Sequence, residues 1–491
     1  MLFNSIEFFI FFPIVVLLYF LTPFRRRWLL LLLASYYFYM AWKPAYAIIL
    51  VISTLIDYTC SRSMGRYTDE EKDRRKPWLW LSLGSNLGIL LLFKYYNFFN
   101  DSARELALAL HVPYAMPAFD LLLPMGISFY TFQTMSYSID VYNGRIKPER
   151  HLGIFALFVT FFPQLVAGPI ERAGNLLGQL KEKHDFNYTR VVAGLRRMAW
   201  GFFKKIMIAD NLALMVNEVY NNPGDFEGFS FILATVFFAF QIYCDFSGYS
   251  DIAIGAAQIM GFNLMENFRS PYFAKTIPEF WSRWHISLST WFRDYLYIPL
   301  GGNRVVKWRW YYNLFIVFLV SGLWHGASWT FVVWGALHGV YQVSGILTRE
   351  HRNAFVEKTG LADHPQLYKW VQVLTVFFLV CFAWIFFRAN TIGDAFYIVG
   401  QSFATLTNPL QVFSLDVAHD VYMNQGFKVF MVSVLSVAVM ETVHLIQRNG
   451  SVTALLTQRP AWVRWGVYYA AIIAVLLFGQ FGSQEFIYFQ F

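Results

Sequence analysis

The sequence predicts an all-α integral membrane protein that crosses the bilayer about ten to twelve times. Of its 491 residues, 57% are hydrophobic and only 14% are charged. Apolar runs recur from one end of the chain to the other, with short charged gaps between them. The excess of basic over acidic residues, 39 against 31, forms no basic tail or domain, so it indicates cytoplasmic loops and not a nucleic-acid partner. We therefore expect one membrane domain over residues 1–491.

The first four candidate spans fix the predicted orientation. They cover residues 8–22, 28–42, 45–60 and 78–97. Basic residues cluster in the loops after the first and third spans and are sparse after the second and fourth. Because basic loops stay in the cytoplasm, the N-terminus is predicted to lie outside. The opening segment has no basic n-region and no cleavage pattern, so we expect a retained first helix and not a signal peptide.

The chain after the fourth span is predicted to form an external loop, a returning span and a re-entrant segment. The loop covers residues 98–120 and the span covers 121–142. The apolar run 152–170 should then carry the chain outside, yet the loop after it is basic again. Two prolines and a glycine interrupt this run, at Pro163, Gly168 and Pro169. We therefore expect a segment that enters and leaves on one face and is sheltered from lipid by protein.

The middle of the chain combines an amphipathic helix with an embedded polar block. Basic residues punctuate the apolar pattern at 191–216, as in an interfacial or cavity-lining helix. The apolar run 229–261 contains Asp245 and Asp251 together with several hydroxyl groups. Aspartates inside a span call for a polar cavity or a shared hydrogen-bond network. For any one of these side chains, hydrogen bonding between helices is an equally good explanation.

Residues 263–304 are too polar to span the bilayer and too aromatic for an ordinary loop. Large apolar side chains recur at helical spacing, beginning with Phe280, Trp284 and Leu288. This pattern predicts a helix that lies at the membrane interface. His285 adjoins the apolar stripe, and the pattern alone favours a place in the interfacial aromatic belt over one that points into the core.

Two histidines, His325 and His338, lie in the apolar segments on either side of a turn. An ionisable side chain at membrane depth is costly unless it faces a cavity or a partner, so His325 is predicted to be functional. The alternative is a histidine tucked between helices and hydrogen-bonded to a carbonyl, and for His338 the two interpretations are equally good. Glycines in these segments would let backbones or a ligand approach closely. They are Gly322, Gly326, Gly335 and Gly339.

The C-terminal third contributes the remaining spans. A polar linker at 348–366 follows the histidine segments, and a longer mixed stretch occupies 390–426. The predicted spans cover residues 369–387, 427–445 and 462–481. No internal repeat and no low-complexity segment is visible in the sequence.

Several familiar kinds of active site are excluded. The sequence has no complete G-x-S-x-G motif, no Walker A loop and no H-E-x-x-H. The three cysteines form no C-x-x-C pair, so we expect neither a disulfide framework nor a zinc site. His325 and His338 would lie about 20 Å apart along a continuous helix and could share a metal only if the chain breaks between them. His285 and His325 could converge, but no carboxylate or thiolate stands at ligand spacing, so no metal is expected.

A neutral imidazole in a desolvated cavity is a competent general base. Because no positioned serine or cysteine nucleophile is evident, His325 would most simply deprotonate an acceptor hydroxyl as it attacks an activated acyl group. Acyl transfer inside a membrane is the reaction class that this predicts. Asp245 or Asp251 could orient the imidazole by accepting its second N–H. A transporter with a histidine proton relay is the alternative, which composition does not separate from an acyltransferase.

Ordered motifs along the chain resemble those of the membrane-bound O-acyltransferase (MBOAT) superfamily. They are Met1-Leu2-Phe3-Asn4-Ser5, Pro124 to Gln133, Phe162 to Arg172, Gln241 to Asp251, Glu279 to Ser289 and on to Arg304, and Gly322-Leu323-Trp324-His325-Gly326. The chain resembles the bacterial branch that contains alginate O-acetyltransferase, peptidoglycan O-acetyltransferase and the teichoic-acid D-alanyl transfer protein. The C-terminal third is less distinctive.

The resemblance implies tilted helices around a central polar tunnel, with His325 at its narrowest point. His285 is the second candidate catalytic residue that it implies, and His338, Asp245 and Asp251 would support the site. Residues 1–120 would then be N-terminal helices, 121–347 the catalytic core and 348–491 C-terminal helices. The residues that bind the donor are not indicated.

The resemblance also implies the substrates and the location. Acetyl-CoA on the cytoplasmic side of the bacterial inner membrane would be the donor, with no metal involved. The acceptor would be an extracytoplasmic polysaccharide of the alginate type or a partner acetyltransferase protein. The enzyme itself would be embedded in membrane lipid. Peptidoglycan O-acetylation and D-alanyl transfer to teichoic acid are the alternatives within the family.

Overall fold

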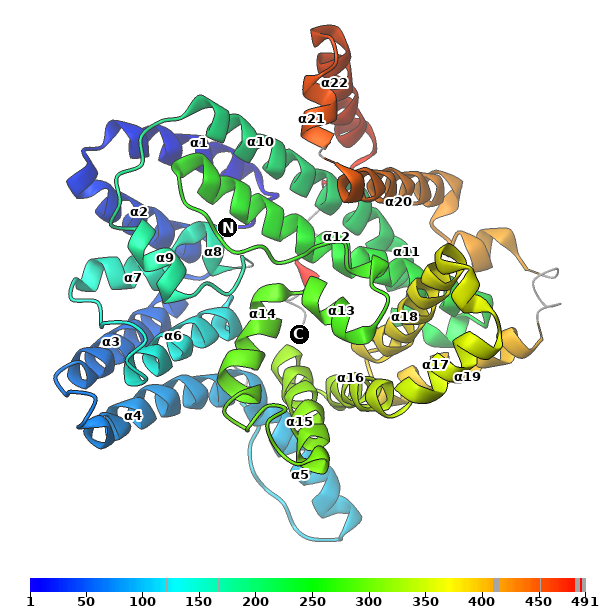
Figure 1. The fold of residues 1–491 in the computed structure, drawn as a ribbon, viewed down its shortest axis with the longest axis horizontal. Helices are drawn as coiled ribbons and strands as arrows, with labels where there is room; N and C mark the ends of the chain where they lie inside the picture. Colours follow the sequence, from blue (N-terminus) through cyan, green and yellow to red (C-terminus); the bar gives the residue numbers. More distant parts are fainter. Residues whose placement is uncertain (120–121, 167, 409–414, 451, 482–485, 488–491) are drawn as a thin grey trace. The chain divides into compact units, whose positions relative to one another are not determined.

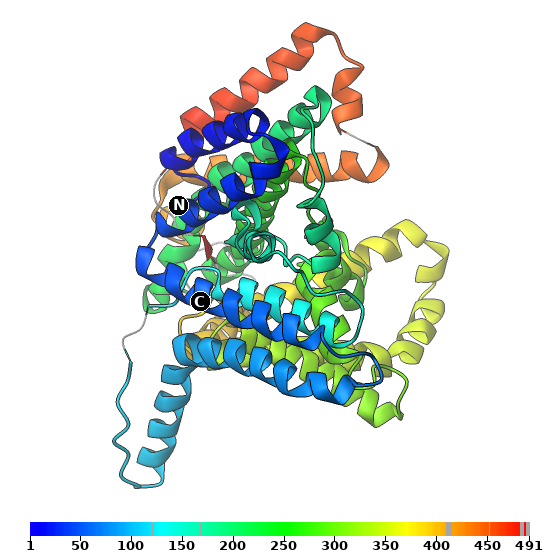
Figure 2. The same cartoon turned by 90° about the vertical axis from the view of Figure 1, so that its left-hand side faces the viewer.

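The computed structural model describes residues 1–119, 122–166, 168–408, 415–450, 452–481 and 486–487. In these residues the chain is helical and no strand occurs (Figures 1 and 2). The helices gather in two compact units. Unit 1 comprises residues 1–198, 250–266 and 290–296, and unit 2 comprises residues 199–249, 267–289 and 297–491. The predicted all-α fold is confirmed, whereas the division at residues 120 and 347 stays a prediction.

Six helices in the described part of the chain are long and apolar enough to cross a membrane. They are Pro44–Met64, Phe229–Met260, Trp329–Leu347, Pro365–Arg388, Gly426–Arg448 and Ala461–Phe478. Each corresponds to an apolar run that the sequence predicts as a span. The predicted multi-pass membrane protein is therefore confirmed, and the count of ten to twelve spans stays a prediction.

Unit 1 contains the N-terminal helices. They are α1 (Ile6–Leu21), α2 (Phe24–Met40), η1 (Pro44–Tyr46), α3 (Ala47–Met64), α4 (Lys72–Leu90), η2 (Leu91–Tyr95), α5 (Tyr96–Ala109), α6 (Ile127–Tyr142), α7 (Leu152–Thr160), α8 (Phe162–Leu165) and α9 (Ala173–Gln179), with most of α10 (Tyr188–Phe202) and the last turns of α12 (Phe229–Met260). Helices α3 and α4 lie side by side, and both pack on α6 (Figure 2). The loop predicted at 98–120 is helical in its first half, because η2 leads directly into α5, and its external position stays a prediction. Alanine and leucine, both strong helix formers, dominate the end of α5.

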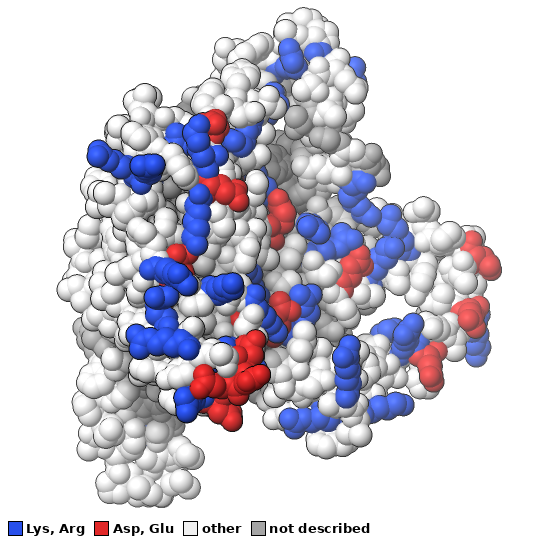
Figure 3. Space-filling model, turned by 60° about the vertical axis from the view of Figure 1, so that its left-hand side comes forward, with Lys and Arg blue, Asp and Glu red and all other residues white. Residues whose placement is uncertain are grey.

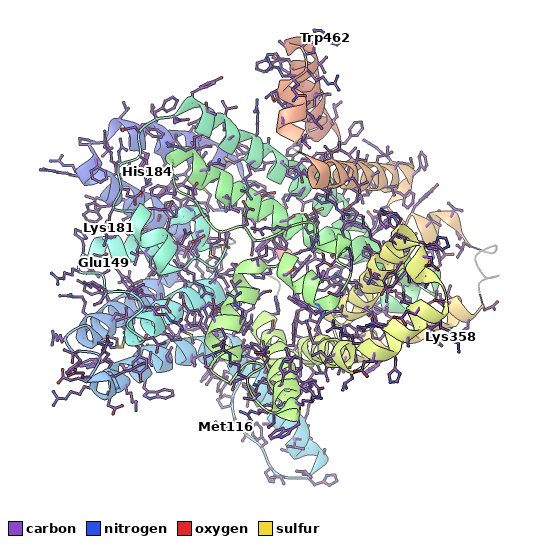
Figure 4. The ribbon with its side chains drawn as sticks, in the orientation of Figure 1. Met116, Glu149, Lys181, His184, Lys358 and Trp462 are labelled. Carbon is purple, nitrogen blue, oxygen red and sulfur yellow. The ribbon has the colours of Figure 1, made fainter. Side chains whose placement is uncertain are left out.

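Helices α7 and α8 form the short apolar segment that the sequence predicts to be re-entrant. The segment ends at Leu165 and is too short for a continuous span, which needs about 20 residues. The carboxylate of Glu149, before the segment, pairs with the ammonium of Lys181, after it (Figure 4). The chain just before the segment therefore meets the chain just after α9, as is expected of a chain that enters and leaves on one face.

Single cysteines at positions 150 and 183 should be labelled from the same side of the membrane. Arg150 and Lys183 flank the ion pair between Glu149 and Lys181, and both side chains are exposed. The three native cysteines are buried and add little background. The measurement compares labelling by a membrane-impermeant maleimide in intact cells and in inside-out vesicles. Labelling of the two positions from opposite sides would contradict a re-entrant segment.

Unit 2 contains the C-terminal helices. They are η3 (Phe203–Ala209), α11 (Asp210–Asn221), η4 (Pro223–Asp225), η5 (Pro271–Phe273), α13 (Ile277–Arg283), α15 (Lys307–His325), α16 (Trp329–Leu347), α17 (Arg349–Lys358), η7 (Leu361–Asp363), α18 (Pro365–Arg388), α19 (Ile392–Thr407), η9 (Val417–Val421), α20 (Gly426–Asn449), α21 (Val452–Thr457) and α22 (Ala461–Phe478), with most of α12 and the start of α14 (Ile286–Phe292). The π-helix η6 (Arg293–Tyr297) follows α14. The polar linker predicted at 348–366 is largely helical, since α17 and η7 fill it.

Helices α15 and α16 form a tightly packed hairpin (Figure 1). A Cβ atom at Gly335 would lie 2.5 Å from the carbonyl oxygen of Phe318, and one at Gly339 would lie 2.8 Å from the ring of Phe315. Only glycine permits such a close approach of two backbones. Membrane helices depend on close packing of this kind, because the surrounding lipid is as apolar as their side chains and gives no hydrophobic driving force for association. The close approach predicted from the glycines is confirmed.

Helix α22 presents apolar side chains to the surroundings of unit 2. Trp462 is 78% exposed and Leu476 is 64% exposed. The Trp462 side chain stands at the end of the helix (Figure 4). On the face drawn in Figure 3, cationic and anionic side chains are interspersed, and a wide strip at the left carries neither. Exposed apolar side chains such as those of α22 are expected where lipid is the solvent.

Candidate active site

A break between α15 and α16 brings His325 and His338 to one cluster of rings. Helix α15 ends at His325, and the hydroxyl of Ser328 then caps the start of α16. His325 is 2% exposed and His338 is fully buried. The indole of Trp334 lies 4.9 Å from each imidazole, centroid to centroid. The separation of about 20 Å along a continuous helix therefore does not apply, although no group of three or more metal-ligating side chains occurs within the described ranges.

His285 lies at a second break, between α13 and α14. Its backbone takes a left-handed conformation with a φ of 44°. For a residue other than glycine this costs about 1–3 kcal/mol, and such strain clusters at functional sites. Asn267 holds the break in place, because its backbone oxygen accepts the N–H of Ile286 at 2.9 Å and its Oδ1 accepts the hydroxyl of Ser287 at 2.9 Å. The interactions from Asn267 satisfy the groups that the break exposes.

The single helix predicted from the stripe that begins at Phe280 is wrong, because the chain breaks between α13 and α14, and so is the place of His285 in the aromatic belt. His285 is fully buried. The stripe that begins with Phe280, Trp284 and Leu288 has the predicted helical spacing, but these side chains are buried and face the core of the protein. An aromatic stripe that packs against other aromatic side chains has the same sequence pattern as one that faces the membrane interface.

The hydrogen bonds at Asn267 define the tautomer of His285. The Nδ1 atom of His285 lies 3.1 Å from Asn267 Oδ1, and the backbone N–H of Ser287 donates to the same oxygen at 3.3 Å. Since a backbone N–H only donates, the shared atom is the amide oxygen, so His285 carries its proton on Nδ1 and keeps a lone pair on Nε2. His285 lies outside the six candidate spans, and burial lowers its pKa to about 3. The ring is therefore neutral at physiological pH.

Aromatic side chains surround the two imidazoles. The rings of His285 and His325 lie 6.5 Å apart and face edge to face. Trp324 lies 5.0 Å from His325 and 6.1 Å from His285. Phe387 lies 5.4 Å from His325, and Phe246 lies 4.6 Å from His285. Both imidazoles are therefore buried among aromatic rings and away from bulk water.

The predicted supporting residue Asp245 pairs with Lys205 and not with an imidazole. The Lys205 ammonium lies 2.6 Å from Asp245 Oδ1 and 2.8 Å from Asp210 Oδ1. The other oxygen of Asp245 accepts the backbone N–H of Ile487 at 2.7 Å. All three charged side chains are almost fully buried. An amide, Asn267, therefore holds the imidazole N–H of His285 in place of the carboxylate that the sequence suggests.

Two features of this region have no counterpart in the sequence patterns. Asn267 is a single polar residue in a polar stretch, and no spacing or motif distinguishes it. Residues 486–487 near the end of the chain pack into unit 2, where the ring of Phe486 lies 5.8 Å from Phe246 and 4.4 Å from Tyr249. Phe246 also contacts His285, so the ring of Phe246 lies between Phe486 and the imidazole of His285.

Asp251 belongs to unit 1, where it pairs with Arg197. The Nε of Arg197 lies 2.9 Å from Asp251 Oδ1, and its two terminal nitrogens donate to Glu266 at 2.7 and 2.6 Å. The paired hydrogen bonds to Glu266 have the fork geometry that makes arginine–carboxylate contacts strong. The predicted support of the site by Asp251 stays a prediction.

Comparisons with known proteins place this arrangement in a family. The family model described as MBOAT, membrane-bound O-acyltransferase family, matches residues 151–387. The probable alginate O-acetylase AlgI of Pseudomonas putida is 38% identical over 408 residues, which are 82% of this chain and 80% of that protein. The peptidoglycan O-acetyltransferase of Helicobacter pylori is 34% identical over 387 residues, 74% of this chain and 71% of that protein.

A more distant match carries the same kind of reaction in its name. The teichoic acid D-alanyltransferase of Bacillus subtilis is 29% identical over 304 residues, 56% of this chain and 71% of that protein. His285, His325 and His338 all fall within the stretch that the family model matches. The chain belongs to the membrane-bound O-acyltransferase family, and it is an O-acyltransferase of the membrane.

Proposed function

We propose that this enzyme takes an acetyl group from acetyl-CoA on the cytoplasmic side of the bacterial inner membrane and delivers it to an extracytoplasmic polysaccharide of the alginate type. Delivery is direct or through a partner acetyltransferase protein. The observation that carries the proposal is the buried pair of His285 and His325, whose rings lie 6.5 Å apart. The alginate O-acetylase relative, which matches over 82% of the chain, supports the choice of acetyl group and polymer.

His325 acts as the general base in this proposal. It takes the proton of an acceptor hydroxyl as the hydroxyl oxygen attacks the carbonyl carbon of the thioester. The C–S bond then breaks, and the leaving CoA thiolate takes the proton from the imidazolium. One hydroxyl and one acetyl-CoA thus give one ester and one CoA thiol. General base catalysis contributes about 10²- to 10⁴-fold to such a step.

His285 is the second catalytic imidazole. Its lone pair on Nε2 accepts a hydrogen bond, and its low pKa means that it does not keep the proton that His325 must pass on. Asp245 supports the site by holding Lys205 and Ile487. The family resemblance also assigns a supporting role to Asp251, which pairs with Arg197 within unit 1.

The donor enters from the cytoplasmic face. Basic side chains that the topology assigns to that face, among them Arg145, Lys147 and Lys183, attract the phosphates of coenzyme A. The N-terminus lies outside, as the distribution of basic loops predicts. Acetyl-CoA is a substrate here, and the proposal assigns no metal to the reaction.

Peptidoglycan O-acetylation is the second candidate, because the Helicobacter pylori relative matches over 74% of the chain. D-alanyl transfer has weaker support, since the teichoic acid relative matches over 56% of the chain. The membership in an acyltransferase family decides against the transporter that the composition also allows.

Deletion of the gene should remove ester-linked acetate from the alginate-type polymer at the cell surface and leave the polymer backbone intact. The physical reason is that no donor from the cytoplasm reaches the outer face without the enzyme. Mass spectrometry of surface polysaccharides from cells with and without the gene measures this. Loss of acetate from peptidoglycan alone would favour the second candidate, and loss of D-alanyl esters with acetate unchanged would contradict acetyl transfer.

A further inference from the structure

Two hydrogen-bond donors project from one face of α16 beside His325. Trp334 and His338 are four residues apart, so their side chains share a helix face. Both side chains are fully buried. The Trp334 indole lies 4.9 Å from the His325 ring and 4.9 Å from the His338 ring. It therefore bridges the proposed general base and the second buried imidazole of the hairpin.

The tautomer of His338 follows from its neighbour Trp281. The Nε1–H of Trp281 donates to Nδ1 of His338 at 3.2 Å. An indole nitrogen only donates, so Nδ1 of His338 holds a lone pair, and the neutral ring carries its proton on Nε2. His338 thus offers an N–H from Nε2 in addition to the N–H that Trp334 offers from Nε1.

Neither of these two N–H groups meets an acceptor among the residues that the structure describes. Buried donors in folded proteins are almost always paired, and each exception calls for an explanation, of which a catalytic role is one. In this tautomer neither Trp334 Nε1 nor His338 Nε2 has a lone pair. The two N–H groups together therefore fit an incoming oxygen and do not bind a cation. A carbonyl or oxyanion oxygen is the group that two adjacent neutral N–H donors suit.

We propose that Trp334 and His338 form the oxyanion-binding site of this enzyme and hold the carbonyl oxygen of the acyl thioester. This inference rests on the proposed function. When the acceptor hydroxyl attacks the carbonyl carbon and passes its proton to His325, the π pair of the carbonyl moves onto its oxygen. The N–H of Trp334 and the N–H of His338 stabilise that negative charge. The C=O bond re-forms as the C–S bond breaks, and the CoA thiolate takes the proton back from His325.

Trp281 is a positioning residue in this arrangement. Its hydrogen bond keeps the lone pair of His338 on Nδ1 and so keeps the N–H on Nε2. Without it the imidazole is free to turn or to shift its proton, and the second donor is lost for part of the time. Trp281→Phe should therefore lower turnover less than the loss of His338 does.

Trp334→Phe tests the proposal, because it keeps the ring and removes only the N–H. We expect a fall in kcat of about 10²-fold or more, the effect of removing one oxyanion-hole donor, with the KM for acetyl-CoA nearly unchanged. The assay is acetyl transfer from acetyl-CoA to the polymer in inside-out membrane vesicles. The melting temperature should not fall, since no hydrogen bond is broken.

Trp291→Phe is the matched control. Trp291 is also buried, but its N–H donates to the carbonyl oxygen of Phe132 at 2.8 Å. The control should show the opposite signature, a lower melting temperature with kcat unchanged, because it removes a buried hydrogen bond. At position 338, His338→Gln keeps an N–H and should retain more activity than His338→Leu.

The outcomes separate this inference from the proposed function. Wild-type kcat in Trp334→Phe, alongside an inactive His325→Gln protein, would overturn the oxyanion site and leave the proposed function standing. A Trp334→Phe protein with raised KM and wild-type kcat would also overturn it, since the N–H would then bind the ground state only. An active His325→Gln protein would overturn the proposed function itself.

Discussion

His325→Gln should abolish acetyl transfer and leave the protein folded. Glutamine is similar in size to histidine and still forms hydrogen bonds, but it does not accept a proton near neutral pH. General base catalysis contributes about 10²- to 10⁴-fold. His325 is 2% exposed among aromatic rings, so bulk water does not replace it, and we expect a loss toward the upper end of that range. The measurement is ester-linked acetate on the surface polymer at matched expression.

His351→Gln is the matched control, because His351 is exposed on α17. It should acetylate like the wild type. His325→Ala should be as inactive as His325→Gln, and the Gln variant should melt at the wild-type temperature in detergent. A His325→Gln protein that extracts normally and retains most acetylation would contradict the role of His325 as base. His285 would then be the next candidate.

Lys205→Met should strongly destabilise unit 2. The Lys205 ammonium lies within 2.8 Å of carboxylate oxygens of both Asp210 and Asp245, and all three groups are buried. Removal of the cation leaves two buried carboxylates side by side. Loss of one partner of a buried ion pair costs about 3–5 kcal/mol. The measurement is the melting temperature of the detergent-extracted protein by fluorescence-detected size exclusion.

An exposed lysine supplies the control. Lys358 lies in the last turn of α17 with its side chain exposed, so Lys358→Met should lower the melting temperature far less than Lys205→Met. Combining Lys205→Met with Asp210→Asn and Asp245→Asn removes all three charges and should recover much of the lost stability, since neutral groups replace buried ion pairs at little net cost. A Lys205→Met protein that melts like the wild type would show that the cluster does not hold unit 2 together.

The parts of the fold that the sequence predicts are those that lipid imposes. A bilayer requires long apolar runs, so the spans Phe229–Met260 and Trp329–Leu347 are visible as patterns. The glycines at 335 and 339 indicate a close approach of two helix backbones, because packing between membrane helices depends on small residues. An ionisable side chain at such depth is rare enough that His325 stands out by itself.

Long-range polar contacts leave no such pattern. Asp245 and Lys205 are 40 positions apart, and Asn267 is 18 positions from His285. Their pairing depends on how helices meet in space, which single residue types do not encode. Asp57 is a similar case, since Ser82 and Asn86 of the neighbouring helix satisfy its buried carboxylate. The sequence does not reveal the break at His285, because the aromatic side chains on either side of it continue the helical spacing across the break.

Inside-out membrane vesicles offer the most direct test of the central claim, that His325 carries an acyl transfer from the cytoplasmic face to a polymer on the other side. Radiolabelled acetyl-CoA is added outside the vesicles, to the face that is cytoplasmic in the cell. The account predicts label in alkali-labile esters of the enclosed polymer with the wild-type enzyme and only background with His325→Gln. Equal labelling with both proteins, or labelling only when acetyl-CoA is supplied on the opposite face, would contradict it.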